Sequence, residues 1–176
     1  LRYLLQTERE LVTLGAELNY VRNYIELQKS MTGRPVVCGI REEEGTADYL
    51  VPTLCVQTFV ENSVKYAKLG APGRELAIRV CVQQLLTEDG IYLDIMVSDN
   101  GGGYPDNILE EINADTRKGT RSVGIHNLKR RCALIYEGKA EYNFYNGGGA
   151  VSELIVPVIN PDRQGIRGET DECIDS

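Results

Sequence analysis

Two neighbouring runs of alternating apolar and polar residues, between residues 75 and 99, constrain the fold most strongly. Each run places its large aliphatic side chains at every second position: Ile78, Val80 and Val82 in the first, and Ile91, Leu93, Ile95 and Val97 in the second. This period of two is typical of a strand with one buried face. The TEDG segment between the runs carries an Asp-Gly turn signal, so we expect an antiparallel hairpin. A hairpin that is apolar on one face needs a second layer to cover it.

The rest of the chain supplies that layer. The segments VQTFVENSVKYA and VGIHNLKRRCALIYEG have helical patterns, VVCGI is a short strand, and KAEYNFYNGGGAVSELIVPVI is expected to form two strands around a glycine turn. NILEEINADTRKGTRS is expected to be a loop with a short helix. The order of elements predicts an α+β two-layer sandwich, with a mostly antiparallel sheet covered by helices on one face.

The first 30 residues are predicted to be helical, in two segments. Thr13 is a candidate cap that separates the end of one helix (1–10) from a second helix (14–30). Apolar residues recur at three- and four-residue steps and form one narrow seam: Leu11, Leu14, Leu18, Val21 and Ile25. A seam this narrow suits packing against another helix. The alternative is that the helix lies on its own domain. At the other end of the chain, residues 160–176 are rich in acids and are expected to be disordered.

Composition excludes several classes of protein. The net charge of -7 argues against non-specific nucleic-acid binding, which needs a cationic face. No run approaches the roughly 18 apolar residues of a membrane span, and no signal peptide is evident, so the chain is expected to be soluble. The five cysteines form no CxxC pair and there is one histidine, which predicts reduced thiols rather than a zinc site. Because the chain lacks an initiating Met, we expect it to be part of a longer protein.

Asp99 ends the second strand and is followed by Asn and three glycines. It shares strand parity with Ile95 and Val97, so its carboxylate is expected on the helix-covered side of the sheet, where an unpartnered charge is costly. A donor on a flat apolar ligand, such as the exocyclic amine of adenine, would satisfy it. Gly101 and Gly103 would let the backbone approach such a ring. The alternative is an ordinary Asp-Asn turn with glycines.

The helix around VENSVKYA places Glu61, Asn62, Lys65 and Tyr66 away from its valine seam. One interpretation is a solvated helix face. The other is a metal–phosphate site, because an amide oxygen suits magnesium, a lysine suits phosphate, and an acid can polarise a reacting group.

Two glycine segments follow. In SVGIHNLKRR, Gly124 opens a helix whose free amides could bind phosphate, and Asn127 follows one turn later. In NGGGAVSELIVP, three glycines before a strand suggest a tight turn, and a simple hairpin is at least as good an explanation.

In their order, the motifs VENSVKYA, SDNGGGYP, SVGIHNLKRR and GGGAVSELIVP resemble the nucleotide-binding boxes of GHKL-type ATPases. Over residues 1–158 the chain is most similar to sensor histidine kinases of the LytS/YesM type. The resemblance implies the Bergerat (GHKL) fold. It also implies remnants of dimerisation helices in residues 1–30, a catalytic domain in residues 31–159 and a tail in residues 160–176.

The resemblance also implies a reaction and roles for single residues. The reaction is transfer of the ATP γ-phosphoryl group to a histidine on a preceding helix, with Mg²⁺ as cofactor. Asn62 would hold magnesium, Glu61 would assist the attacking imidazole, and Lys65 would contact phosphate. The remaining nucleotide-site residues would be Tyr66, Asp99, Gly101, Gly103, Gly124, Ile125 and Asn127. The implied partners are the dimerisation helices of the same or a second subunit and a response regulator. The full-length protein is expected to be membrane-anchored, with this part in the cytoplasm.

The chain departs from the family's sequence motifs in the segments that are implied to bind phosphate. The phosphoacceptor histidine is absent, and His126 lies inside the glycine box. Tyr66, Ser122 and Ala150 replace a histidine, a glycine and a threonine. These changes leave open a second function, a non-catalytic nucleotide-binding regulatory module with a degenerate phosphate loop. A different GHKL enzyme, such as an anti-sigma-factor serine kinase, is a third possibility, which the helices predicted in residues 1–30 disfavour.

Overall fold

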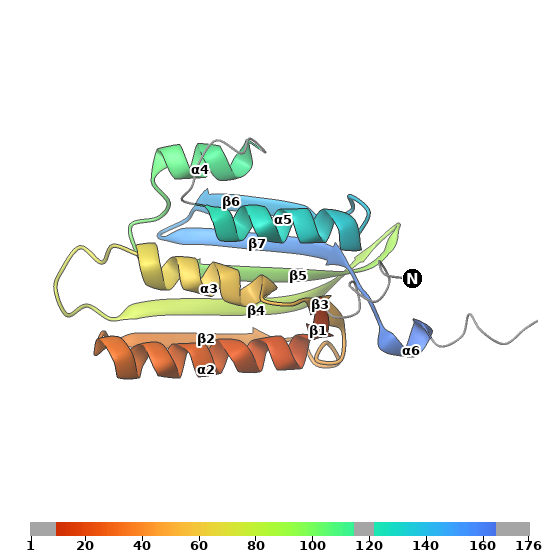
Figure 1. Cartoon of the computed structure of the whole chain (residues 1–176), viewed down its shortest axis with the longest axis horizontal. Helices are drawn as coiled ribbons and strands as arrows, with labels where there is room; N and C mark the ends of the chain where they lie inside the picture. The colour runs from red at the N-terminus through yellow and green to blue at the C-terminus, as the bar shows by residue number, and fades with distance from the viewer. Residues whose placement is uncertain (1–9, 115–121, 165–176) are drawn as a thin grey trace, which may run out of the picture.

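The computed structural model describes residues 10–114 and 122–164, which form a mixed five-stranded sheet covered by helices on one face (Figure 1). In spatial order the strands are β2 (Val36–Glu42), β4 (Leu76–Thr87), β5 (Gly90–Asp99), β7 (Ala150–Pro157) and β6 (Glu141–Asn146). Only β2 and β4 of this sheet pair in parallel, so the predicted two-layer α+β fold is confirmed. The helices over the sheet are α2 (Leu14–Thr32), α3 (Cys55–Tyr66) and α5 (Val123–Ile135). Within the described ranges, no helix has the length and apolar character needed to cross a membrane.

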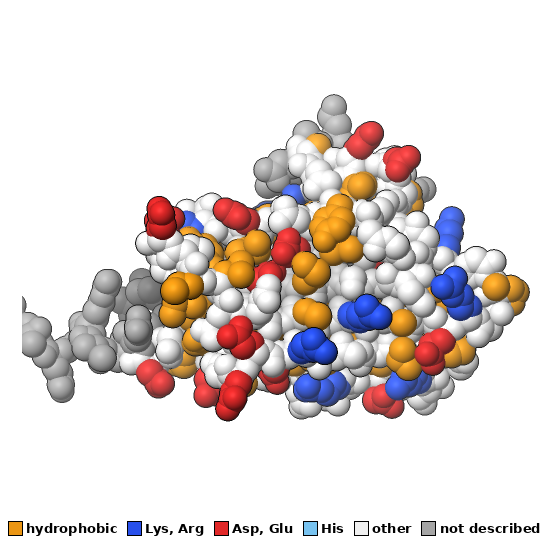
Figure 2. All heavy atoms as spheres, turned by 180° about the vertical axis from the view of Figure 1, so that it is seen from behind, with side chains coloured by type: hydrophobic (Ala, Val, Ile, Leu, Met, Phe, Trp, Pro, Cys, Tyr) orange, Lys and Arg blue, Asp and Glu red, His pale blue; other side chains and the backbone are white. Residues whose placement is uncertain are grey.

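Both predicted hairpins form. β4 and β5 pair from Ile78 and Asp99 to Thr87 and Gly90, and β6 and β7 meet across a glycine turn at Asn146 and Ala150. The alternate aliphatic residues of β4 and β5 face the helices, and from Ile78 to Val82 and from Leu93 to Val97 they are at most 3% exposed. Figure 2 shows the opposite face of the molecule, where charged side chains and scattered apolar ones are exposed.

The second predicted helix of the N-terminal segment is α2, and it begins after Thr13 as expected. The Thr13 hydroxyl accepts a hydrogen bond from the Ala16 amide at 3.2 Å, and Gly33 ends the helix in a left-handed conformation. Four seam residues, Leu14, Leu18, Val21 and Ile25, are buried in the core that also contains α3 and the sheet. The seam therefore lies on its own domain, and α2 shares one core with residues 31–159.

Leu11 was wrongly placed on this helical seam. Residues Leu11–Thr13 form strand β1, which pairs with β3 (Leu50–Pro52) in a separate two-stranded sheet. Strands of three residues are too short to leave a period in the sequence. The first helical segment predicted for residues 1–10 lies outside the described residues except for Glu10, which is in a turn.

The loop regions follow the prediction in part. The short helix expected after the glycine loop is α4 (Asp106–Asn113). The predicted tail is not wholly without structure, because residues Pro161–Gln164 form the short helix α6. Just before the tail, Ile159 forms an isolated antiparallel β-bridge with Leu50. The remainder of the predicted tail lies outside the described residues. Cys55 and Cys132 are free and buried, as predicted for reduced core thiols, whereas Cys81 is exposed.

Candidate functional site

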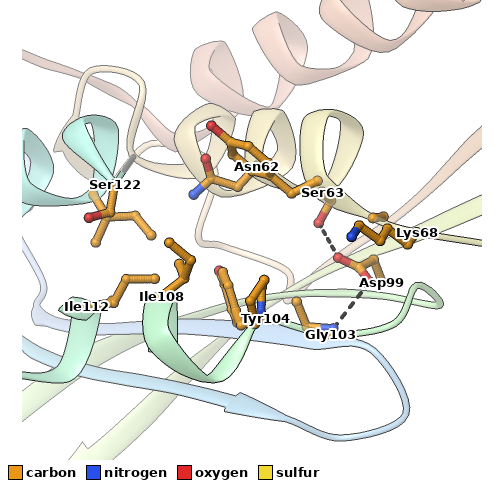
Figure 3. A pocket seen from close by; sticks show the side chains of 14 residues that line it. Asn62, Ser63, Lys68, Asp99, Gly103, Tyr104, Ile108, Ile112 and Ser122 are labelled. Atoms are coloured by element: carbon orange, nitrogen blue, oxygen red, sulfur yellow. Dashed lines mark hydrogen bonds between the residues drawn. The ribbon is translucent and has the colours of Figure 1, made fainter. Parts of the chain in front are cut away.

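A cavity of about 270 Å³ lies where the second half of α3, the loop after β5, α4 and the start of α5 meet (Figure 3). Its lining includes five predicted site residues: Asn62, Tyr66, Asp99, Gly103 and Ile125. Five others do not line it: Glu61, Lys65, Gly101, Gly124 and Asn127. Of the residues predicted for the adenine side, Asp99 and Gly103 line the cavity and Gly101 does not. The structure leaves most of those predicted for phosphate outside the cavity wall.

Asp99 lies at the end of β5 on the helix-facing side, as its strand parity predicts. Its Oδ2 accepts a hydrogen bond from the Ser63 hydroxyl at 2.7 Å. Its Oδ1 accepts from the amides of Gly101 and Ala150 at 2.9 and 3.2 Å. The carboxylate is therefore not unpartnered in the absence of a ligand, because the protein supplies three donors. A carboxylate has about four acceptor sites, so one lone pair remains for a ligand in the cavity.

The glycines after Asp99 allow very close packing. A Cβ on Gly101 would lie 2.7 Å from the Cβ of Ala67, so Gly101 lets the loop approach the end of α3 rather than a ligand. Gly103 has φ of +83°, and a Cβ there would lie 2.6 Å from the Asn146 side chain. These contacts, and not a turn alone, explain why glycine is needed at both positions.

Asn146, at the end of β6, holds the same loop, a role that no local sequence pattern indicates. Its Oδ1 accepts from the Tyr104 amide at 2.7 Å, and its Nδ2 donates to the Tyr104 carbonyl at 3.0 Å. On the other side, Asn100 accepts from the Ala77 amide and donates to the Glu75 carbonyl. The loop is therefore fixed to two strands through side-chain amides.

The polar face predicted for α3 divides into two. Asn62 and Tyr66 line the cavity, whereas Lys65 is exposed and Glu61 accepts a hydrogen bond from Gln57 at 3.0 Å. Ser63 was overlooked because it lies in an otherwise apolar series. It is 6% exposed and belongs to the buried face of the helix.

Buried charge holds α3 in place at its start. Glu17 of α2 is fully buried, and its carboxylate accepts from the amides of Leu54, Val56 and Gln57 at 2.9 to 3.1 Å. Burial raises the pKa of the Glu17 carboxyl, and these hydrogen bonds oppose the increase. Glu17 replaces a side-chain cap, because the residue before the helix is Leu54, in a left-handed conformation.

An arginine holds the other end of α3. Arg34 donates to the carbonyls of Val64 and Ala67 at 3.2 and 2.9 Å, at the negative end of the helix dipole. The helix that carries Asn62 and Ser63 is thus anchored at both ends by side chains from outside it.

The start of α5 closes the far end of the cavity. Ser122 is buried and donates a short hydrogen bond to Glu111 of α4. His126 lies 3.6 Å from the same carboxylate. Ser122 and Ile125 line the cavity, whereas Gly124 lets α5 pack against Thr58 of α3. Asn127 is exposed.

Apolar residues form the wall between these ends, and the sequence analysis did not select them. Tyr104, Ile108 and Ile112 line the cavity together with Ile125, and Lys68 stands near Asp99 (Figure 3). An apolar wall with a few polar groups is typical of a small-molecule site.

A metal ion would rely on Asn62. Among the described residues there is no group of three or more His, Cys, Asp or Glu side chains suited to a metal. A divalent cation at Asn62 would take most of its ligands from phosphate oxygens and water, which is the usual situation for Mg²⁺.

The fold is that of the catalytic domains of histidine kinases. The catalytic domain of histidine kinase ThkA matches 84% of this chain and 93% of its own length, with a TM-score of 0.55 and 17% identity. The blue-light activated histidine kinase of Erythrobacter litoralis EL346 matches 84% of this chain and 42% of its own, with a TM-score of 0.53 and 21% identity.

In sequence, the chain is similar to LytS-type sensor histidine kinases, as predicted. It is 30% identical to the sensor protein LytS of Staphylococcus epidermidis over 148 residues, which are 82% of this chain and 24% of that protein. The sensor histidine kinase/phosphatase LytS of Staphylococcus aureus is 28% identical over 142 residues, 78% of this chain and 23% of that protein. The chain thus spans about a quarter of the length of these relatives. No family model matches it.

Proposed function

We propose that this chain is the ATP-binding catalytic domain of a two-component sensor histidine kinase. The observation that carries this proposal is the position of Asp99. Its carboxylate has one acceptor site left, at the end of a cavity whose wall is largely apolar. An adenine ring presents an amine on a flat apolar frame and matches both features.

In this proposal, different residues of the cavity bind different parts of the nucleotide. Asp99 accepts the adenine amine, while Tyr104, Ile108 and Ile112 enclose the ring. Asn62 offers its amide oxygen to Mg²⁺, which would neutralise phosphate charge when bound.

The phosphate side is proposed from the family resemblance. Lys65, Gly124 and Asn127 contact phosphates, Tyr66 and Ile125 lie beside the nucleotide, and Glu61 assists the attacking imidazole. Because Lys65 and Asn127 are exposed, their contacts require the phosphates to extend beyond the cavity.

The context of the whole protein is also part of the proposal. The γ-phosphoryl group would pass to a histidine on a helix that precedes residue 1, and from there to a response regulator. The helix α2, within the predicted remnant of residues 1–30, shares the core of the catalytic domain. By resemblance, the full-length protein is a membrane-anchored dimer with this domain in the cytoplasm.

Replacing Asp99 by Asn tests the adenine assignment. Asn can still accept from the Gly101 and Ala150 amides and can donate to Ser63, so the fold should persist. Loss of the charged acceptor should weaken nucleotide binding roughly tenfold or more. Calorimetric titration with a non-hydrolysable ATP analogue and Mg²⁺ measures this, with Asp89→Asn in the exposed β4–β5 turn as the matched control. Equal affinity in both variants would remove the assignment.

A specific observation favours a second function, a regulatory module that binds nucleotide without transferring phosphate. Ser122 replaces the first glycine of the usual box, and its side chain is buried and bonded to Glu111 at the cavity's end. A longer form of the protein that carries the preceding helix separates the two functions. Nucleotide binding with acid-labile phosphate on that helix supports the kinase, and binding without it supports the module.

A further inference from the structure

A second hollow, of about 470 Å³, lies next to the candidate nucleotide cavity, where α3 passes into β4. The segment before β2 and the loop of residues 68–74 form its wall, and the function proposed above makes no use of it. Its lining contains three cationic residues, Arg34, Lys68 and Arg74, and no acidic one, so we call it the basic hollow. In a chain with 26 acidic and 19 basic residues, a site without acids is not an average piece of surface. Figure 2, in which this end of the molecule lies on the right, shows Lys and Arg side chains gathered toward it.

The strand register brings the two arginines close together. β2 and β4 are parallel and Val36 is in register with Leu76, so each arginine lies two residues before a paired position. The Leu76 amide donates to the Pro35 carbonyl at 2.9 Å, which extends this pairing toward Arg34 and Arg74. Like charges on neighbouring segments repel each other, so the arrangement costs energy that an anion between them would offset.

Arg34 is held in place and still has donors to offer. It is half-buried, and two of its N–H groups donate to the carbonyls of Val64 and Ala67 at 3.2 and 2.9 Å. These neutral carbonyls do not cancel its charge, and the planar guanidinium carries further N–H donors. The cation is therefore positioned before any ligand arrives, which reduces the entropy lost on binding.

A tight turn positions Arg74. The Arg74 amide donates to the Ala71 carbonyl at 3.4 Å, and Gly73 has φ of +77°. Proline at the first central position and glycine at the second, as in Pro72 and Gly73, are what a type II turn favours. The sequence APGR thus fixes the point at which the chain delivers Arg74 to the start of β4.

No carboxylate neutralises these charges within the part of the chain that the structure describes. The two ion pairs found there lie elsewhere, and neither includes Arg34, Lys68 or Arg74. Glu75 follows Arg74 directly in the chain and forms no ion pair with it. Lys68 lines both the basic hollow and the nucleotide cavity, and Figure 3 shows it near Asp99. It therefore adds positive charge at the boundary between the two spaces.

We propose that the basic hollow binds a small oxyanion of the phosphate class, with Arg34 and Arg74 as its main ligands. The guanidinium fork matches the spacing of phosphate oxygens, and hydrogen bonds between two charged groups are the strong ones. The ligand is free phosphate or a small phosphate ester, which share this chemistry. The inference goes beyond the proposed function and does not depend on nucleotide binding.

The test is a titration of the full chain with inorganic phosphate at pH 7.5, without nucleotide and at constant ionic strength. In ¹H–¹⁵N spectra the amide signals of Gly70 and Gly73 should shift and saturate, with half-saturation at about 1–10 mM. Gly45 and Gly90 are equally exposed glycines in other loops, and their signals should not follow the titration.

A matched pair of variants shows whether the arginine carries the binding. Arg74→Ala should weaken phosphate binding about five- to tenfold, because it removes a charge-assisted hydrogen bond. Arg41→Ala removes the same charge from an exposed position of β2 that does not line the hollow, and should change the affinity less than about twofold. If Arg74→Ala fails to fold, Arg74→Met, which keeps the aliphatic stem, takes its place.

Glycerol 3-phosphate in the same titration distinguishes the two sources of the anion. Tighter binding of the ester assigns the hollow to a small organic phosphate, and tighter binding of inorganic phosphate assigns it to the free anion. Either result supports the proposal, provided that Arg74→Ala weakens the binding.

Three results would overturn the inference. They are shifts that rise without saturation, equal effects of Arg74→Ala and Arg41→Ala, and phosphate-induced shifts confined to the nucleotide cavity. Phosphate binding at Gly70 and Gly73 in a chain that binds no nucleotide would refute the proposed function and leave this inference standing. Nucleotide binding in a chain whose basic hollow takes no phosphate would refute this inference alone.

Discussion

At the scale of single residues, the Asp99 carboxylate is held in position by contacts within the protein. A carboxylate in a largely apolar wall is costly, and this one is stabilised by one hydroxyl and two backbone amides. One of those amides belongs to Ala150, which can approach only because the preceding residue is glycine. The geometry of Asp99 therefore depends on a residue in a distant part of the chain.

Among the glycines of the described residues, Gly149 leaves the least room for a side chain. A Cβ at this position would overlap the backbone carbonyl oxygen of Asp99, which cannot swing aside as a side chain could. Gly149→Ala should therefore displace β7 from Asp99, break the Ala150 hydrogen bond, and lower the free energy of unfolding by about 2–4 kcal/mol. Nucleotide affinity should fall with it. Denaturant unfolding and calorimetric titration measure the two effects.

The adjacent glycine provides the control. Gly148 has φ of +76°, and a Cβ there would have no atom of the described residues within 4 Å beyond its chain neighbours. Gly148→Ala should cost only the strain of a left-handed alanine, about 1–2 kcal/mol, and should change nucleotide affinity little. Similar losses of affinity in the two variants would contradict the role assigned to Gly149.

At the scale of elements, the site depends on how α3 is held. The helix carries Asn62 and Ser63, yet it has no side-chain cap of its own at its start. The Glu17 carboxylate from α2 takes that place, and Arg34 binds the last carbonyls. Because both anchors come from other segments, packing of α2 and of the entry to β2 sets the position of the site.

Glu17→Ala should test how far the position of α3 depends on its anchor in α2. Three amides at the start of α3 would lose their acceptor, which should lower the free energy of unfolding by about 2–3 kcal/mol. Glu26→Ala on the exposed side of the same helix removes only a surface ion pair with Lys29, and should cost no more than about 0.5 kcal/mol. Urea unfolding followed by circular dichroism compares them. A small effect of Glu17→Ala would mean that water replaces the carboxylate.

These anchors mark the limit of what the sequence could predict. The strands β4 and β5, the helices α2 and α3, and the orientation of Asp99 follow from local periodicity, which requires only neighbours in the chain. Glu17 and Asn146 act on partners about 40 residues away, and no local pattern encodes such contacts. The sequence placed Glu61 and Lys65 with Asn62 on one helix face. Only the packed helix shows that this face is divided between the cavity and solvent.

At the scale of the whole molecule, the sheet has one covered face and one open face. The open face is crossed by a polar row from four strands: Gln83, Asp94, Glu153 and Asn143. Gln83 donates to Asp94 at 2.9 Å and Asn143 donates to Glu153 at 2.7 Å. The two acids are diagonal neighbours on β5 and β7, because Asp94 is in register with Ile155 and Glu153 with Met96. Asp94 is 5% exposed, and its Oδ1 has no hydrogen-bond donor among the described residues.

This arrangement makes stability depend on pH. Burial, followed by the nearby Asp94, raises the pKa of the Glu153 carboxyl above its ordinary value of 4.5, against the effect of the Asn143 hydrogen bond. The folded state therefore holds this proton more tightly than the unfolded state. The stabilisation is fully present below the unfolded pKa and is lost as the pH rises through the folded pKa.

Glu153→Gln should remove that loss. The amide remains neutral at every pH and can donate to Oδ1 of Asp94, so the variant should melt at a higher temperature than the wild type at pH 7.5. The difference should shrink toward pH 4, below the ordinary pKa of 4.5, where the Glu153 carboxyl is mostly protonated in both states. Glu88→Gln in the exposed β4–β5 turn changes the net charge equally and serves as the control. Melting curves that differ by the same amount at both pH values would show that the acid pair does not govern the stability of the open face.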